Sequence, residues 1–154
     1  MTETRNTKWI KASPETLYQA FTDPTSLPHW FAPEGMTAEV HSFDYRIGGG
    51  YQMSLYYPST EPTPRGKTKG NEDRYTARFV ELTPPHRIVT AIIFDTTNPD
   101  LAEEMFMEVT FTPEQDGTTV SITFTHIPPG IRPEDNEEGT HSTLERLARF
   151  VTSA

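Results

Sequence analysis

The stretch 41–57 constrains the fold most, because it predicts two neighbouring strands joined by a tight connection. Its second half, 51–57, alternates large apolar side chains with more polar ones, which is the period of a half-buried strand. Three consecutive glycines, Gly48, Gly49 and Gly50, precede that half, and glycine permits positive φ and close backbone approach. We therefore expect a bulged β-hairpin. A phosphate-binding loop is the functional alternative, but no Gly-Lys-Ser/Thr and no predicted helix follow the glycines.

The rest of the chain predicts a meander of strands around this hairpin. Strands are expected at 6–11, 37–44, 51–57, 74–82, 87–94, 104–112 and 118–126. Two short helices should follow the first strand, because Ser13-Pro14-Glu15 and then Asp23-Pro24 are helix-start signals. The second of these helices should reach about Trp30.

A long helix is expected from about 133 to 151, at the end of the chain. One apolar stripe runs along it, at Thr140, Leu144, Leu147, Ala148 and Val151. Acidic residues crowd its first turns and arginines its last, which suits the helix dipole. The apolar stripe of this helix and the apolar face of the sheet must each be buried against another apolar surface. We therefore expect an α+β fold, in one domain over 1–154, whose curved antiparallel sheet of six or seven strands wraps around this helix.

Composition limits the partners and the chemistry. The net charge is −9 over 154 residues, which argues against nucleic acid or an anionic membrane surface as partner. The chain has no cysteine, so disulfides and thiolate chemistry are excluded. No apolar run approaches the ~18 residues of a membrane span, and the first residues show no apolar signal core. We expect a soluble cytoplasmic protein without membrane insertion, as a monomer or a homodimer.

Several short motifs resemble one known family. The run DYRIGGGY at 44–51 resembles the Asp-x-Arg-x-Gly-Gly-x-Tyr pattern of the START-like (SRPBCC) superfamily, with one extra glycine. More closely it resembles the branch named after the activator of Hsp90 ATPase homologue. The runs ASPETLYQAF at 12–21 and ELTPPHRI at 81–88 are similar to other parts of that family, as is Trp30. The resemblance covers essentially the whole chain and implies the helix-grip fold with a hydrophobic cavity between sheet and helix.

One departure from the family bears on that cavity. The family usually carries Gly-Trp in its last helix, and this chain has Gly139-Thr140. A missing indole would enlarge the space between helix and sheet. The alternation of the strands and this departure give one set of candidate ligand-binding residues: Trp30, Met53, Tyr75, Phe79, Ile92, Met107, Phe111, His126, Thr140, His141 and Leu144.

Other candidate groups have a plain structural alternative. His126 and His141 can bind a polar ligand group together, or can be two ordinary histidines. Asp44 and Arg46 can form an acid–base pair or can stabilise the turn. No zinc-site spacing, nucleophile elbow or dinucleotide fingerprint occurs, so we expect no metal and no cofactor.

Three functions stay open from the sequence. Binding of a small hydrophobic molecule is favoured, since the resemblance implies a cavity and no catalytic motif is visible. A cyclase or hydratase type of enzyme in the same cavity is the second, with His126→Ala as its test. A co-chaperone that stimulates an Hsp90-type ATPase is the third, as the branch name suggests. The segment 58–73 has three prolines, two glycines and no large apolar residue, so we expect a mobile loop that is dispensable for folding.

Overall fold

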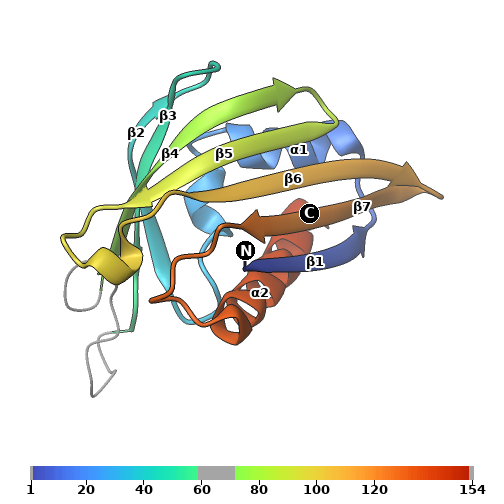
Figure 1. The fold of residues 1–154 in the computed structure, drawn as a ribbon. Coiled ribbons are helices and arrows are strands. Elements are labelled where there is room, and N and C mark those ends of the chain that lie inside the picture. Colours follow the sequence, from blue (N-terminus) through green and yellow to red (C-terminus); the bar gives the residue numbers. More distant parts are fainter. Residues whose placement is uncertain (1, 59–71, 153–154) are drawn as a thin grey trace.

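The computed structural model describes residues 2–58 and 72–152, which form seven strands, two α-helices and two short 3-10 helices. The strands form a single antiparallel sheet in the order β1-β7-β6-β5-β4-β3-β2 (Figure 1). In chain order the elements are β1 (Glu3–Ile10), α1 (Pro14–Thr22), η1 (Leu27–His29), β2 (Thr37–Asp44), β3 (Gly50–Tyr56), β4 (Glu72–Thr83), β5 (Arg87–Phe94), η2 (Pro99–Leu101), β6 (Met105–Glu114), β7 (Gly117–Thr125) and α2 (Pro133–Thr152).

The curved sheet wraps around α2, so the predicted helix-grip arrangement is confirmed (Figure 1). Leu144 and Leu147 of the predicted stripe are fully buried, and Thr140 is buried one turn before them. Alternate residues of β6, from Met105 to Phe111, are buried on the same inner face of the sheet. The apolar stripe and the apolar sheet face therefore cover each other, as the sequence predicted.

The first helix forms where its start signal predicted. The hydroxyl of Ser13 accepts a hydrogen bond from the backbone N–H of Thr16 at 3.1 Å, and Pro14 takes the first helical position. The second predicted helix is only the single 3-10 turn η1, and Trp30 lies just after it. Pro28 within that turn has no N–H to donate, which fits a short irregular helix.

The glycine-rich connection between β2 and β3 is a hairpin loop, as predicted. A side chain at Gly50 would place its Cβ 1.9 Å from the carbonyl oxygen of Ala77, and Gly50 has a φ of +149°. Only glycine therefore allows β3 to pair with β4 at this point. Arg46 and Asp44 form an exposed ion pair of 2.7 Å where β2 enters the loop, which is the contact that the turn-stabilising alternative predicts.

The remaining differences lie at element ends. β1 begins at Glu3, three residues before the predicted start. β4 begins at Glu72, because Glu72 and Asp73 pair with Tyr56 and Leu55 of β3. These two residues therefore belong to a strand and not to the predicted mobile loop. The rest of that prediction, 59–71, lies outside the described residues.

Candidate ligand-binding cavity

A cavity of about 750 Å³ lies between the N-terminal half of α2 and one end of the inner sheet face. Three parts of the chain build it: strands β3 to β7 form the floor, α2 and the loop before it form one wall, and the segment 31–36 forms the other. The lining residues are Phe31, Pro33, Glu34, Met36, Leu55, Tyr57, Pro58, Asp73, Tyr75, Ile92, Phe94, Met105, Met107, Ile122, Phe124, Gly130, Ile131, Arg132, Asp135, Asn136, Glu138, Gly139, Thr140, Ser142 and Thr143.

The floor is apolar because the strands alternate in register. Each strand from β4 to β7 contributes two residues spaced two apart, such as Met105 and Met107 of β6. Antiparallel pairing then sets these residues side by side: Met107 lies opposite Phe124, and Met105 opposite Ile92. The result is a continuous surface of aliphatic, aromatic and thioether groups suited to an apolar ligand.

The helix wall is more polar than the floor. Thr140 is only 7% exposed, and its hydroxyl donates to the carbonyl oxygen of Asn136 at 2.7 Å. The side chain of Asn136 in turn accepts a hydrogen bond from the hydroxyl of Thr4 in β1. The first bond lies within α2, and the second links this part of α2 to the edge strand β1. A ligand in the cavity therefore meets an apolar floor and a wall that carries hydrogen-bonding groups.

A polar pair, the buried Asp73 and the half-buried Tyr57, interrupts the apolar floor at the ends of β3 and β4. Asp73 is only 3% exposed, and the hydroxyl of Tyr57 donates to its carboxylate at 3.0 Å. Next to it, the hydroxyl of Tyr75 donates to the sulfur of Met53 at 3.3 Å. Burial raises the pKa of the Tyr75 phenol well above its usual range, so this group stays protonated at neutral pH. The floor of the cavity thus contains the carboxylate of Asp73 beside the neutral phenol of Tyr75.

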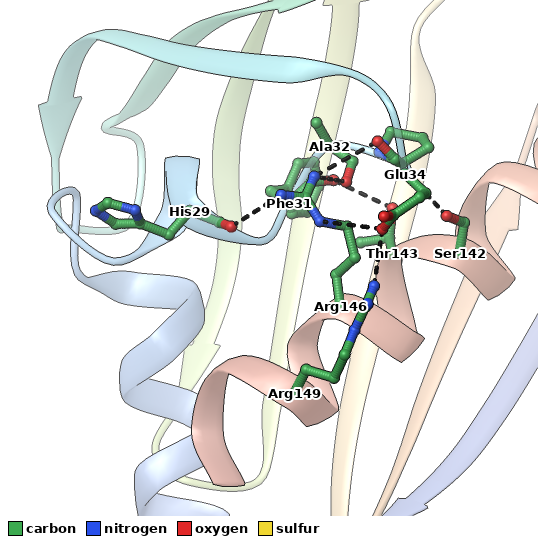
Figure 2. A network of polar contacts seen from close by, with 9 residues as sticks. His29, Phe31, Ala32, Glu34, Ser142, Thr143, Arg146 and Arg149 are labelled. Atoms are coloured by element: carbon green, nitrogen blue, oxygen red, sulfur yellow. Dashed lines mark hydrogen bonds and ion pairs between the residues drawn. The ribbon is translucent and has the colours of Figure 1, made fainter. Parts of the chain in front are cut away.

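The segment 29–36, which we call the strap, is fastened to α2 by polar contacts. Figure 2 shows the guanidinium of Arg146 reaching the strap, where it donates to the carbonyl oxygens of Ala32 at 2.6 Å and His29 at 3.2 Å. The backbone N–H of Glu34 donates to the hydroxyl of Ser142 at 2.7 Å. These contacts hold the strap, and with it Pro33 and Met36, in place as the second wall.

Two further contacts tie the strap to the same helix. The hydroxyl of Thr143 donates to the carbonyl oxygen of Phe31 at 3.1 Å (Figure 2). The carboxylate of Glu34 accepts from Arg149 at 2.8 Å near the surface. Side chains of α2 therefore donate hydrogen bonds to backbone carbonyls of the strap. In a free loop, water would donate these bonds.

Four of the sequence-predicted site residues line this cavity: Tyr75, Ile92, Met107 and Thr140. Four others are buried but lie outside the lining: Trp30, Met53, Phe79 and Phe111. Their strand or loop positions do face inward, so the predicted direction was correct. Ligand contact by any of these residues stays a prediction.

The buried residues outside the lining are covered by other side chains of the chain. Phe21 of α1 lies edge-on to Trp30, with ring centroids 4.6 Å apart, and to Phe111 at 5.4 Å. Tyr51 packs against Phe79 with centroids 5.8 Å apart. α1 and the hairpin therefore fill one end of the inner face, and the cavity takes the other end.

The three remaining predicted site residues do not lie at the cavity. His126 is exposed, because its φ of +58° breaks the strand alternation after β7, and its ring packs edge-on against Phe106. His141 is 72% exposed on α2 and lies 3.9 Å from Glu145. Leu144 is buried below the cavity without lining it. The prediction that His126 faces inward is wrong, and neither histidine lines the cavity.

Sequence patterns did not predict the strap, Asp73 or most of the helix wall as parts of the site. Asp73 was assigned to a loop, although its spacing of two from Tyr75 is the strand period. Asn136 and Thr143 lie four before and three after Thr140, so helical spacing could have found them. The strap carried no such signal, because its place depends on side chains of α2 more than a hundred residues away.

Neither a metal cluster nor a membrane-crossing helix is found in residues 2–58 and 72–152. No three His, Cys, Asp or Glu side chains there gather as metal ligands do. No helix in these ranges is long and apolar enough to cross a membrane.

A helix-grip sheet with a cavity beneath its long helix defines the class of this protein as START-like. The sequence matches the family described as Activator of Hsp90 ATPase homolog 1-like protein over residues 11–152. The chain belongs to this family, in the superfamily that its motifs predicted. No curated protein matches the sequence.

Solved structures of similar proteins agree with this assignment. Protein CV1439 of Chromobacterium violaceum is 30% identical and superposes with a TM-score of 0.87, over 99% of this chain and 98% of that one. A protein of Rhodobacter sphaeroides is 20% identical, with a TM-score of 0.75 over 99% and 93%. An AHSA1 protein of Silicibacter pomeroyi is 17% identical, with a TM-score of 0.75 over 96% and 95%. The last two likenesses show the fold alone.

Proposed function

We propose that this protein binds a small, largely apolar ligand in the cavity between α2 and the inner sheet face. The observation that carries the proposal is the volume of about 750 Å³ above a floor that is apolar except at Tyr57 and Asp73. Ligand sites commonly measure roughly 300–1,000 Å³ and combine apolar walls with a few polar groups. Asp73 and the polar side of α2 supply those few groups here.

The expected affinity is micromolar. Binding at that level corresponds to about −8 kcal/mol, which a modest apolar ligand reaches when most of its surface is buried. The methionines of the floor, Met105 and Met107, have flexible unbranched side chains that adapt to ligands of different shape. We therefore expect the cavity to bind neutral apolar probes in addition to its natural ligand.

The test compares two tryptophan substitutions at neighbouring positions of α2. Thr140→Trp places an indole in the cavity wall, whereas His141→Trp places the same group on the exposed side of the helix. The probe is N-phenyl-1-naphthylamine, whose fluorescence rises in apolar surroundings. We expect the Kd of the probe to rise about tenfold or more for Thr140→Trp, which is about 1.4 kcal/mol, and to stay unchanged for His141→Trp.

Two results would overturn the proposal. One is a wild-type protein that binds no neutral apolar probe and carries no copurified small molecule in native mass spectrometry. The other is a Thr140→Trp variant that is folded by circular dichroism and binds the probe as the wild type does.

An enzyme of the cyclase or hydratase type is the alternative, and the Asp73–Tyr57 pair favours it. A buried carboxylate beside a phenol in a cavity wall can hold or move a proton on a bound substrate. In this alternative a ligand identified by mass spectrometry is converted by the wild type, and Asp73→Asn abolishes turnover while the Kd is kept. His126→Ala no longer tests it, because His126 is exposed outside the cavity.

The family description names a third activity, the activation of an Hsp90 ATPase. Stimulation of a purified Hsp90-type ATPase by this protein would favour that role. An unchanged ATPase rate together with probe binding would favour the small-ligand role.

A further inference from the structure

Gly139 lies inside α2 and lines the cavity, although glycine weakens a helix. Glycine in a helix interior is less favourable than alanine, because the unfolded glycine backbone has more freedom to lose. Among the described glycines, Gly139 is the one within a helix. A glycine at this position would be explained if neighbouring atoms left no room for a Cβ, as they leave none at Gly50.

Packing does not explain this glycine. A Cβ atom built on Gly139 meets one described atom within 4 Å, the Cγ of Pro33 at 3.6 Å, which is an ordinary van der Waals distance. At Gly50, by contrast, the Cβ would lie 1.9 Å from a backbone oxygen. Alanine therefore fits at position 139 without displacing its surroundings.

The same geometry shows where a longer side chain at this position would go. Gly139 and Pro33 both line the cavity, on α2 and on the strap, so atoms added at Gly139 start between the two walls. Pro33 cannot easily move away. Arg146 holds the adjoining carbonyl of Ala32, and Ser142 holds the N–H of Glu34 (Figure 2). Added side-chain volume would therefore reduce the space left for a ligand.

We propose that Gly139 is a specificity-determining residue, whose missing side chain leaves room for a ligand between α2 and the strap. The proposal rests on the proposed binding function. It assigns the ligand a bulky group that lies against the helix backbone at Gly139 and against the ring of Pro33. Compared with a variant that carries alanine at position 139, the natural chain has a less stable helix and a wider cavity.

The test measures stability and binding on the same variants. Gly139→Ala should raise the melting temperature of the probe-free protein by about 2–4 °C, because alanine has the higher helix propensity. The same substitution should raise the Kd of N-phenyl-1-naphthylamine about threefold. Gly139→Leu should weaken the probe about tenfold or more. His141→Leu adds the same side chain on the exposed side of α2 and should leave the Kd unchanged.

Failure of this inference and failure of the proposed function give different results. A melting temperature that falls for Gly139→Ala shows a structural glycine and overturns the inference. A folded Gly139→Leu variant with wild-type affinity overturns it as well, and if that variant does not fold, an unchanged Kd for Gly139→Ala does the same. A wild-type protein that binds no neutral apolar probe and carries no copurified small molecule overturns the proposed function itself.

Discussion

The hydrogen bonds between Arg146 and the strap predict a large loss of stability when the guanidinium is removed. Arg146 is 23% exposed and donates to three backbone carbonyls of the strap, those of Ala32, Pro33 and His29. Methionine keeps the apolar stem of the side chain and loses these three bonds. A hydrogen bond to a charged group contributes roughly 1.5–3 kcal/mol. Because freed strap carbonyls recover water, we expect less than the sum of three such bonds, so Arg146→Met should cost about 2–3 kcal/mol in total.

The matched control is Arg149→Met, one turn along the same helix. Arg149 is 66% exposed and pairs with Glu34 at 2.8 Å, so its contribution is that of a surface ion pair, at most about 1 kcal/mol. The assay is urea unfolding followed by the fluorescence of the buried Trp30, with linear extrapolation to water. Equal losses for the two variants, at equal slopes, would refute the account of how the strap is held.

Two further predictions concern the fold. Leu147→Asp should lower the free energy of unfolding by several kcal/mol, because it buries an unpaired charge. The control Phe150→Asp, at a partly exposed position, should lower it much less. Equal melting temperatures of Leu147→Asp and wild type would contradict the packing of α2. Hydrogen bonds from Thr25 lower the pKa of the Asp23 carboxyl in the folded protein. The ionised carboxyl therefore stabilises the fold above the pKa of an unfolded aspartate, about 3.9, and this stabilisation is lost as the pH falls through the lower pKa of the folded state. Asp23→Asn should therefore flatten the acid limb of the stability curve in urea titrations from neutral pH down, and an unchanged limb would count against this assignment.

Periodicity in the sequence was enough to predict the sheet and the long helix. The spacing of two in β6 and of three or four in α2 set which side chains face inward, and Met107 and Leu147 are buried as those periods require. These periods follow from local backbone geometry, so they can be read without knowing any tertiary contact.

The position of the cavity on the inner face could not be predicted from these periods. Phe111 and Met107 lie on the same face of β6, but Phe21 of α1 covers Phe111 while Met107 lines the cavity. Which end α1 fills depends on contacts between distant segments. His126 was mispredicted for a local reason: one residue with positive φ ends the alternation, and the sequence carried no glycine there to signal it.

The most direct test of the central claim is to locate a bound ligand with the methionine methyl groups as reporters. Met36, Met105 and Met107 line the cavity, whereas Met53 is buried outside its lining. In the protein with 13C-labelled methionine methyl groups, bound N-phenyl-1-naphthylamine should give intermolecular NOEs to Met105 and Met107, and none to Met53. NOEs that are confined to Met53, or absent from Met105 and Met107 at saturating probe, would contradict binding in this cavity.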